Sequence, residues 1–168
     1  MRIRAEKPDD SAAISALICA AFEHAPHRSG TEAAIVAALR HAQALTVSLV
    51  AELNHELVGH VAFSPVTISD AKAGWFGLGP LAVHPDCQRQ GIAARLVKAG
   101  LQELVAIEAG GCVVLGDPDY YSRFGFVADA GLRYGDVPVQ YFQRLVLAGK
   151  APSGSVAYHS SFDVAATS

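Results

Sequence analysis

Cysteine and clustered positive charge are both scarce in this chain of 168 residues. The three cysteines, Cys19, Cys87 and Cys112, are an odd and sparse set that suits a reducing compartment and gives no disulfide framework. The net charge is −3 and lysine and arginine form no run, whereas a surface for nucleic acid needs clustered positive charge. The sequence therefore predicts an intracellular protein that binds no nucleic acid.

Long apolar runs are also missing, and we expect no targeting leader. The first ten residues mix charges of both signs without an apolar core, which is not typical of a secretory signal. No uncharged apolar run approaches the roughly 20 residues that cross a bilayer. We expect a soluble, cytoplasmic protein that does not bind a membrane.

Metal ligands do not recur at a useful spacing. The chain has seven histidines, and His24 and His27 lie three residues apart, but no matched acidic or cysteine partners follow them as a zinc site would require. We therefore expect no bound metal.

Length and hydrophobic content favour one domain. A chain of 168 residues with 51% hydrophobic residues can build one full core but not two comfortable ones. We expect a single domain over residues 1–168, with 163–168 frayed at the C-terminus. Cys19 and Cys112 lie in apolar surroundings and are expected to be small core residues.

The apolar spacing predicts a mixture of helices and strands. Residues at i, i+3, i+4 and i+7 mark helices, and runs rich in branched and aromatic residues mark strands. Helices are expected at 11–22, 31–41, 91–109 and 120–124, and strands at 3–6, 46–52, 57–68, 75–83, 112–115, 139–147 and 154–162.

The stretch from Gly79 to Ala93 leads from an apolar strand through a polar turn into the clearest helix. A helix start leaves backbone N–H groups without partners and carries partial positive charge, so it can bind an anion. Gly91 has no side chain to hold a pyrophosphate away from the backbone. Neither the Walker spacing nor the Rossmann spacing of glycines is present. An ordinary helix cap remains the alternative.

Two further features concern the strands on either side of this helix. Gly79-Pro80 interrupts the strand 75–83, and because proline cannot donate to a ladder, a bulge or a splayed edge is expected there. Gly110-Gly111 is expected to end the helix. The order strand, helix, strand then predicts a parallel pair of strands joined by a crossover helix.

Two motifs carry a resemblance to a known family. The segment Gln88-Arg89-Gln90-Gly91-Ile92-Ala93 resembles the Gln/Arg-x-x-Gly-x-Gly/Ala signature of the GNAT superfamily of N-acetyltransferases. Tyr121 precedes Gly125-Phe126 by four residues, and the run Leu115–Phe126 is similar to a bacterial branch often called YhbS-like. The resemblance implies an α/β (α+β) GNAT fold. Its central sheet is mixed and mostly antiparallel, splayed at the acetyl-CoA strand, with helices on both faces.

The resemblance also implies the reaction. Acetyl-CoA would be the co-substrate, and its acetyl group would pass directly, in a ternary complex, to a primary amine of a small molecule or peptide. The residues implied for binding acetyl-CoA are Leu81, Ala82, Val83, Gln88, Arg89, Gln90, Gly91, Ile92, Ala93 and Tyr121. An alternative is a coenzyme A sensor or interaction module with little catalysis. The oligomeric state is left as monomer or homodimer.

Tyr121 is the implied general acid. A tyrosine hydroxyl, with an ordinary pKa of about 10, can protonate a thiolate that is held within hydrogen-bond reach. The base is less clear, because Gly74–His84 contains no carboxylate. His60 and His84 are the candidates, although a histidine on a strand is more often a hydrogen-bonded structural residue.

The acceptor pocket would lie at the polar insert Glu23–Gly30. There Glu23 could bind a cationic amine and Arg28 a carboxylate. The alternative is a solvated loop between two helices.

Overall fold

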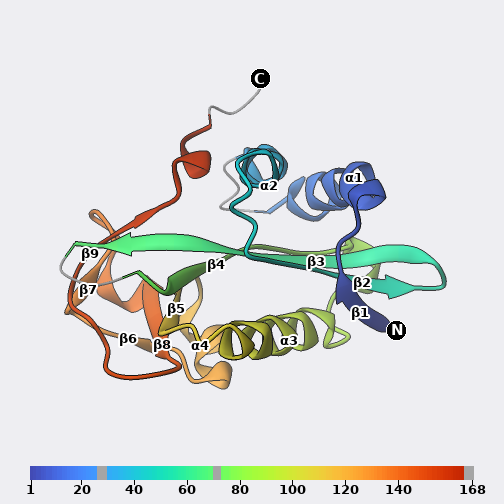
Figure 1. Ribbon diagram of the computed structural model, residues 1–168. Coiled ribbons are helices and arrows are strands. Elements are labelled where there is room, and N and C mark those ends of the chain that lie inside the picture. The colour runs from blue at the N-terminus through green and yellow to red at the C-terminus, as the bar shows by residue number, and fades with distance from the viewer. Residues whose placement is uncertain (26–29, 70–72, 165–168) are drawn as a thin grey trace.

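The computed structural model describes residues 1–25, 30–69 and 73–164. A mixed sheet lies between two layers of helices (Figure 1). Its strands are β1 (Arg2–Ala5), β2 (Val47–Leu53), β3 (Glu56–Ile68), β4 (Trp75–Val83), β5 (Gly111–Leu115), β6 (Val127–Ala128), β7 (Leu132–Arg133), β8 (Phe142–Val146) and β9 (Gly154–Tyr158). The α-helices are α1 (Ser11–Phe22), α2 (Glu32–His41), α3 (Ile92–Ala106) and α4 (Pro118–Tyr121), and five short 3-10 helices are η1 (Pro8–Asp10), η2 (Pro85–Cys87), η3 (Ser122–Phe124), η4 (Val139–Tyr141) and η5 (Ser160–Asp163).

The sheet is mostly antiparallel. Its order is β1-β2-β3-β4-β5-β8-β6, and β9 pairs with the far end of β3 and with β7. Among the described strands only β4–β5 and β7–β9 are parallel. The predicted mixed sheet is thus confirmed, as is the parallel pair β4–β5 joined through α3.

The hairpin between β2 and β3 forms where the sequence predicts it. Its two turn residues, Asn54 and His55, have φ of 52° and 66°. Two consecutive residues with positive φ are typical of the type I′ turn, whose twist matches that of the flanking strands.

The helices cover opposite faces of the sheet (Figure 1). On one face, Ile14 and Ile18 of α1 pack with Ala62 of β3 and Ala82 of β4. On the other face, α3 buries Leu96, Val97 and Leu104 in the main core. Since each helix has one apolar side, the sheet is buried on both faces over its centre.

The strand β4 carries a bulge at Gly79-Pro80, as the proline predicts. Val61 of β3 faces Leu81, but Phe63 faces Leu78, so three steps along β4 match two along β3. One extra residue therefore lies in β4. The pairing of β4 with β5 ends just before the bulge, since the register pairs run only from Trp75↔Gly111 to Gly77↔Val113.

The prediction for the end of the long helix is wrong. Helix α3 ends at Ala106, and Glu108, with φ of 61°, reverses the chain there. Gly110 instead donates a backbone hydrogen bond to Gly74 and Gly111 opens β5. A Cβ on either glycine would clash with the ring of Trp75, so the pair is needed for packing rather than for capping.

Three smaller predictions also need correction. The expected strand 139–147 begins as η4, because Pro138 precedes it and accepts a hydrogen bond from the Tyr141 N–H. Cys19 is exposed rather than in the core, whereas Cys112 is buried. Asp163 belongs to η5 and Val164 packs against the Leu39 cluster, so the described end of the chain is ordered to residue 164. The rest of the expected frayed segment, 165–168, lies outside the described residues.

Candidate functional site

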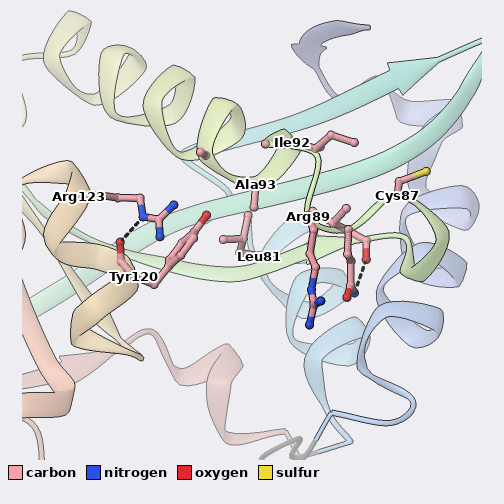
Figure 2. A pocket seen from close by; sticks show the side chains of 11 residues that line it. Leu81, Cys87, Arg89, Ile92, Ala93, Tyr120 and Arg123 are labelled. Carbon is pink, nitrogen blue, oxygen red and sulfur yellow. Dashed lines mark hydrogen bonds between the residues drawn. The ribbon is translucent and has the colours of Figure 1, made fainter.

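A cavity of about 510 Å³ opens where β4, the loop after it and the start of α3 meet. We call it the cradle cavity. Figure 2 shows Leu81 between two walls, with Arg89 and Cys87 on one side and Tyr120 and Arg123 on the other. The lining residues that enter the argument are Leu81, Val83, Gln88, Arg89, Gly91, Ile92, Ala93, Tyr120 and Arg123.

The start of α3 faces this cavity with unpaired amides. The first helical hydrogen bond runs from Arg95 N–H to Gly91 C=O at 3.1 Å, so the N–H groups of Ile92 and Ala93 have no partner within the helix. No described residue caps them, and Gly91, with φ of 81°, has open space where a Cβ would stand. A helix N-terminus of this kind attracts an anion.

The loop between β4 and α3 is held in place by its own side chains. Gln88 Nε2 donates to the Val83 carbonyl oxygen at 3.2 Å, and His84 Nδ1 accepts from the Asp86 N–H at 3.1 Å. Arg89 adopts φ of 64°, which costs a non-glycine residue about 1–2 kcal/mol. Strain of this kind clusters at binding sites. Gln90 is exposed and does not line the cavity.

The backbone of β4 presents alternate residues to the cradle cavity. The His84 N–H bonds Val58 C=O of β3, and in an antiparallel pair the bonding groups of successive residues point to opposite sides. The backbone N–H and C=O groups of Leu81 and Val83 therefore point away from β3, toward the edge of β4 that no longer pairs with β5. Ala82 points its backbone toward β3 and its side chain into the core below α1. Of the three predicted strand residues, Ala82 does not line the cavity.

The opposite wall was not predicted from the sequence. Arg123 lies 4.3 Å from the centroid of the Tyr120 ring and donates from Nε to the Tyr120 carbonyl at 2.9 Å. Desolvation by burial raises the pKa of the Tyr120 hydroxyl above its ordinary value. The spacing of three residues on a short helix is the one signal that could have indicated that these two side chains share a wall.

A second cavity, of about 360 Å³, lies on the other side of Leu81. We call it the aromatic cavity because five of its lining residues carry rings: Phe22, Tyr121, Tyr134, Tyr158 and Phe162. Leu81 lines both cavities. The backbone that faces the cradle cavity is thus adjacent to a second, mainly apolar space.

Tyr121 lines the aromatic cavity and not the cradle cavity. Its ring packs edge-on against Tyr120 and Phe126 and lies where a Cβ on Gly116 would stand. Burial raises the pKa of Tyr121 well above the ordinary tyrosine value, and the nearby Tyr120 raises it further. The hydroxyl is therefore protonated at neutral pH, as a proton donor must be.

His60 is fully buried and lines neither cavity. Its Nε2 lies 2.9 Å from Ser48 Oγ and 3.9 Å from a carboxylate oxygen of Glu6. Glu6 is also bonded to Ser48 and, at 2.8 Å, to Arg40 of α2. These contacts favour the structural alternative for His60, a polar link that joins β3 to β2, to α2 and to the residue after β1. His84, the other candidate base, is occupied in the loop after β4.

Of the two predicted acceptor residues, the structure describes only Glu23. Glu23 lies at the end of α1 and lines a third cavity, of about 520 Å³, together with Glu32 of α2. Arg28 lies outside the described residues. Glu32, which the sequence did not single out, lines both this cavity and the aromatic cavity.

Two other kinds of site do not occur within the described ranges. No group of three or more His, Cys, Asp or Glu residues in them could hold a metal ion. None of the helices there is long and apolar enough to cross a bilayer.

Comparison with known proteins points to one family. The acetyltransferase (GNAT) domain matches residues 44–128, which include every residue named for the cradle cavity. The chain is 42% identical over 127 residues to the Escherichia coli K12 protein called uncharacterized N-acetyltransferase YhbS, covering 75% of this chain and 73% of that protein.

Two crystal structures are similar over nearly the whole chain. One is a GNAT family acetyltransferase from Brucella melitensis in complex with acetyl-CoA, at 46% identity and a TM-score of 0.87, covering 96% of this chain and 97% of that one. The other is YhbS from Escherichia coli in complex with CoA, at 38% identity and a TM-score of 0.88, covering 97% and 92%.

Proposed function

Because the chain belongs to the GNAT family of N-acetyltransferases, we propose that it transfers the acetyl group of acetyl-CoA to a primary amine in a direct ternary complex. The observation that carries this proposal is the meeting of the unpaired α3 amides and the open edge of β4, beyond its pairing with β5, in one cavity. The two similar crystal structures, which contain acetyl-CoA and CoA, support the same co-substrate here.

The residues of the cradle cavity fit the parts of acetyl-CoA. The N–H groups of Ile92 and Ala93 would bind the diphosphate at the helix N-terminus, and Gly91 leaves it room. The backbone of Leu81 and the Val83 N–H would hydrogen-bond the pantetheine arm as though it were an added strand, while the Val83 carbonyl accepts from Gln88. Arg89 and Arg123, both on the cavity wall, would add positive charge beside the phosphates.

Acetyl-CoA supplies an activated thioester when it is bound. In the transfer a bond forms between the amine nitrogen and the carbonyl carbon, the C–S bond breaks, and the departing thiolate gains a proton. Backbone N–H groups of the Leu81–Val83 segment are suited to stabilise the developing oxyanion. Tyr121, across Leu81 in the aromatic cavity, would donate the proton to sulfur.

The acceptor would enter through the aromatic cavity. This cavity shares Leu81 with the cradle cavity, so an amine lodged in it would meet the thioester at the splayed end of β4. No observation favours the alternative of a coenzyme A sensor with little catalysis.

The test combines binding and turnover. Calorimetry measures acetyl-CoA binding, and a free-thiol assay with a library of primary amines measures transfer. We expect binding at one site and thiol release that depends on the amine. Binding without thiol release from any amine would contradict catalysis, and absence of binding would contradict the whole proposal.

A further inference from the structure

The aromatic cavity has a composition that selects its occupant. Its wall combines five aromatic rings with the aliphatic side chains of Ile35, Leu78 and Leu115. Tyr158 lies at the centre of the ring cluster, with centroids 4.9 Å from Tyr134 and 5.0 Å from Phe162. Such a surface binds an apolar or aromatic ligand favourably and a highly charged ligand unfavourably.

Glu32 is the one charged side chain among the described residues that line this cavity. It reaches the cavity from the first turn of α2. A carboxylate can accept several hydrogen bonds at once, so Glu32 can bind an ammonium in addition to its other contacts. The described wall offers no second acid for a dication and no base for a carboxylate.

The volume limits the size of the acceptor. At about 360 Å³ the cavity falls near the lower end of the range of roughly 300–1,000 Å³ for small-molecule pockets. The aromatic wall is close-fitting, since Tyr158 occupies the space where a Cβ on Gly77 would stand. This size suits a small amine rather than a folded polypeptide.

From these observations we infer that the acceptor is a small arylalkylamine, with its ring against Tyr134, Tyr158 and Phe162 and its amino group at Glu32. This inference deepens the proposed function and rests on it. The rings also favour a cation through their π faces. An amino acid is disfavoured because its carboxylate would face Glu32, and a diamine because its second ammonium would lie in an apolar wall.

Glu32 has a second consequence for the reaction. The amine must lose a proton before its nitrogen attacks the thioester. Glu32 accepts this proton and passes it to water, while the second proton that the nitrogen loses ends on the coenzyme A sulfur. The overall reaction then releases one proton for each amide formed.

The first experiment compares four acceptors with saturating acetyl-CoA: 2-phenylethylamine, n-butylamine, 1,4-diaminobutane and phenylalanine. We expect kcat/KM for 2-phenylethylamine to exceed each of the others by about tenfold or more. Equal or faster reaction of any of the other three would overturn the inference. If acetyl-CoA binds in calorimetry but 2-phenylethylamine does not react, the inference fails while the proposed function stands; without acetyl-CoA binding, both fail.

The second experiment tests Glu32 with matched variants. Glu32→Gln should raise KM for 2-phenylethylamine by about tenfold and leave the affinity for acetyl-CoA unchanged. Glu103→Gln removes the same charge from an exposed position of α3, on the other face of the sheet, and should leave both constants unchanged. The assignment is overturned if Glu32→Gln behaves like this control, or if Glu23→Gln produces the rise in KM instead.

Discussion

Gly77 and Val113 are the last residues that pair β4 with β5. Beyond them β4 stays paired with β3 as far as Val83, but its other edge no longer pairs with β5, and the backbone groups of Leu81 and Val83 face this open edge. The start of α3 lies beside the open edge in the cradle cavity. The divergence of two strands thus leaves polar backbone groups in a sheet without partners, which a bound extended molecule can satisfy.

Replacing Tyr121 by phenylalanine tests the proton donor. The substitution keeps the ring that packs against Phe126 and removes only the hydroxyl. We expect kcat to fall about tenfold or more, with no change in the affinity for coenzyme A measured by calorimetry. Tyr141→Phe makes the same change at an exposed position and should leave kcat unaltered. Near-normal turnover of Tyr121→Phe would remove this residue from the role.

Replacing Gly91 by alanine tests the anion site at α3. The added methyl group would stand in the open space before the helix, where the diphosphate is proposed to bind. We expect the dissociation constant for acetyl-CoA to rise about tenfold. Gly135→Ala is the matched control, because Gly135 also has positive φ and open space around it but does not line the cavity. Both variants should lose about 1 kcal/mol of stability, and equal affinities would argue against the site.

Replacing Gly77 by alanine tests whether the aromatic cavity receives the acceptor. The new Cβ would collide with the Tyr158 ring and displace that wall. Because Gly77 does not line the cradle cavity, we expect KM for the amine to rise while the affinity for acetyl-CoA stays constant. A circular dichroism melting curve would check that the variant folds. An unchanged KM in the folded variant would show that the acceptor binds elsewhere.

The half-buried carboxylate of Glu6 predicts a dependence of stability on pH. Desolvation opposes its ionisation, but the nearby His60 and the hydrogen bonds from Arg40 and Ser48 prevail and lower its pKa from 4.5 to about 2. A lowered pKa in the folded state means that the stabilisation is present above the unfolded value and is lost as the pH falls toward 2. Urea unfolding should therefore show a decline on the order of 1–3 kcal/mol between about pH 4.5 and 2.

Glu6→Gln supplies the comparison for that measurement. This variant should be less stable at pH 7, because Arg40 loses its ionic partner. Its stability should also vary less across the acidic range than that of the unchanged chain. Parallel curves for the two proteins would contradict the role assigned to Glu6.

Local patterns in the sequence predicted the elements well but not their mutual orientation. Gly91 could be predicted as the helix start because capping depends on nearby residues. The bulge at Pro80 followed from its missing N–H. The two-residue strands β6 and β7 are too short to show a period.

The site residues that escaped prediction depend on contacts between distant segments. Which of Tyr120 and Tyr121 faces the cradle cavity is decided by packing on Gly116, and Glu32 reaches the aromatic cavity because α2 lies near β4 and η5. The extra residue of the bulge lies directly before Leu81. It shifts the inward and outward alternation of the strand by one residue, so alternation in the sequence alone could not predict that the backbone groups of Leu81 and Val83 face outward and those of Ala82 face β3.

Amide hydrogen exchange with and without coenzyme A tests the central claim most directly. It reports, residue by residue, which backbone N–H groups gain protection when the ligand binds. We predict slower exchange at Leu81, Val83, Ile92 and Ala93, the amides that face the cradle cavity. Binding of coenzyme A that leaves the exchange of these four amides unchanged would contradict the account.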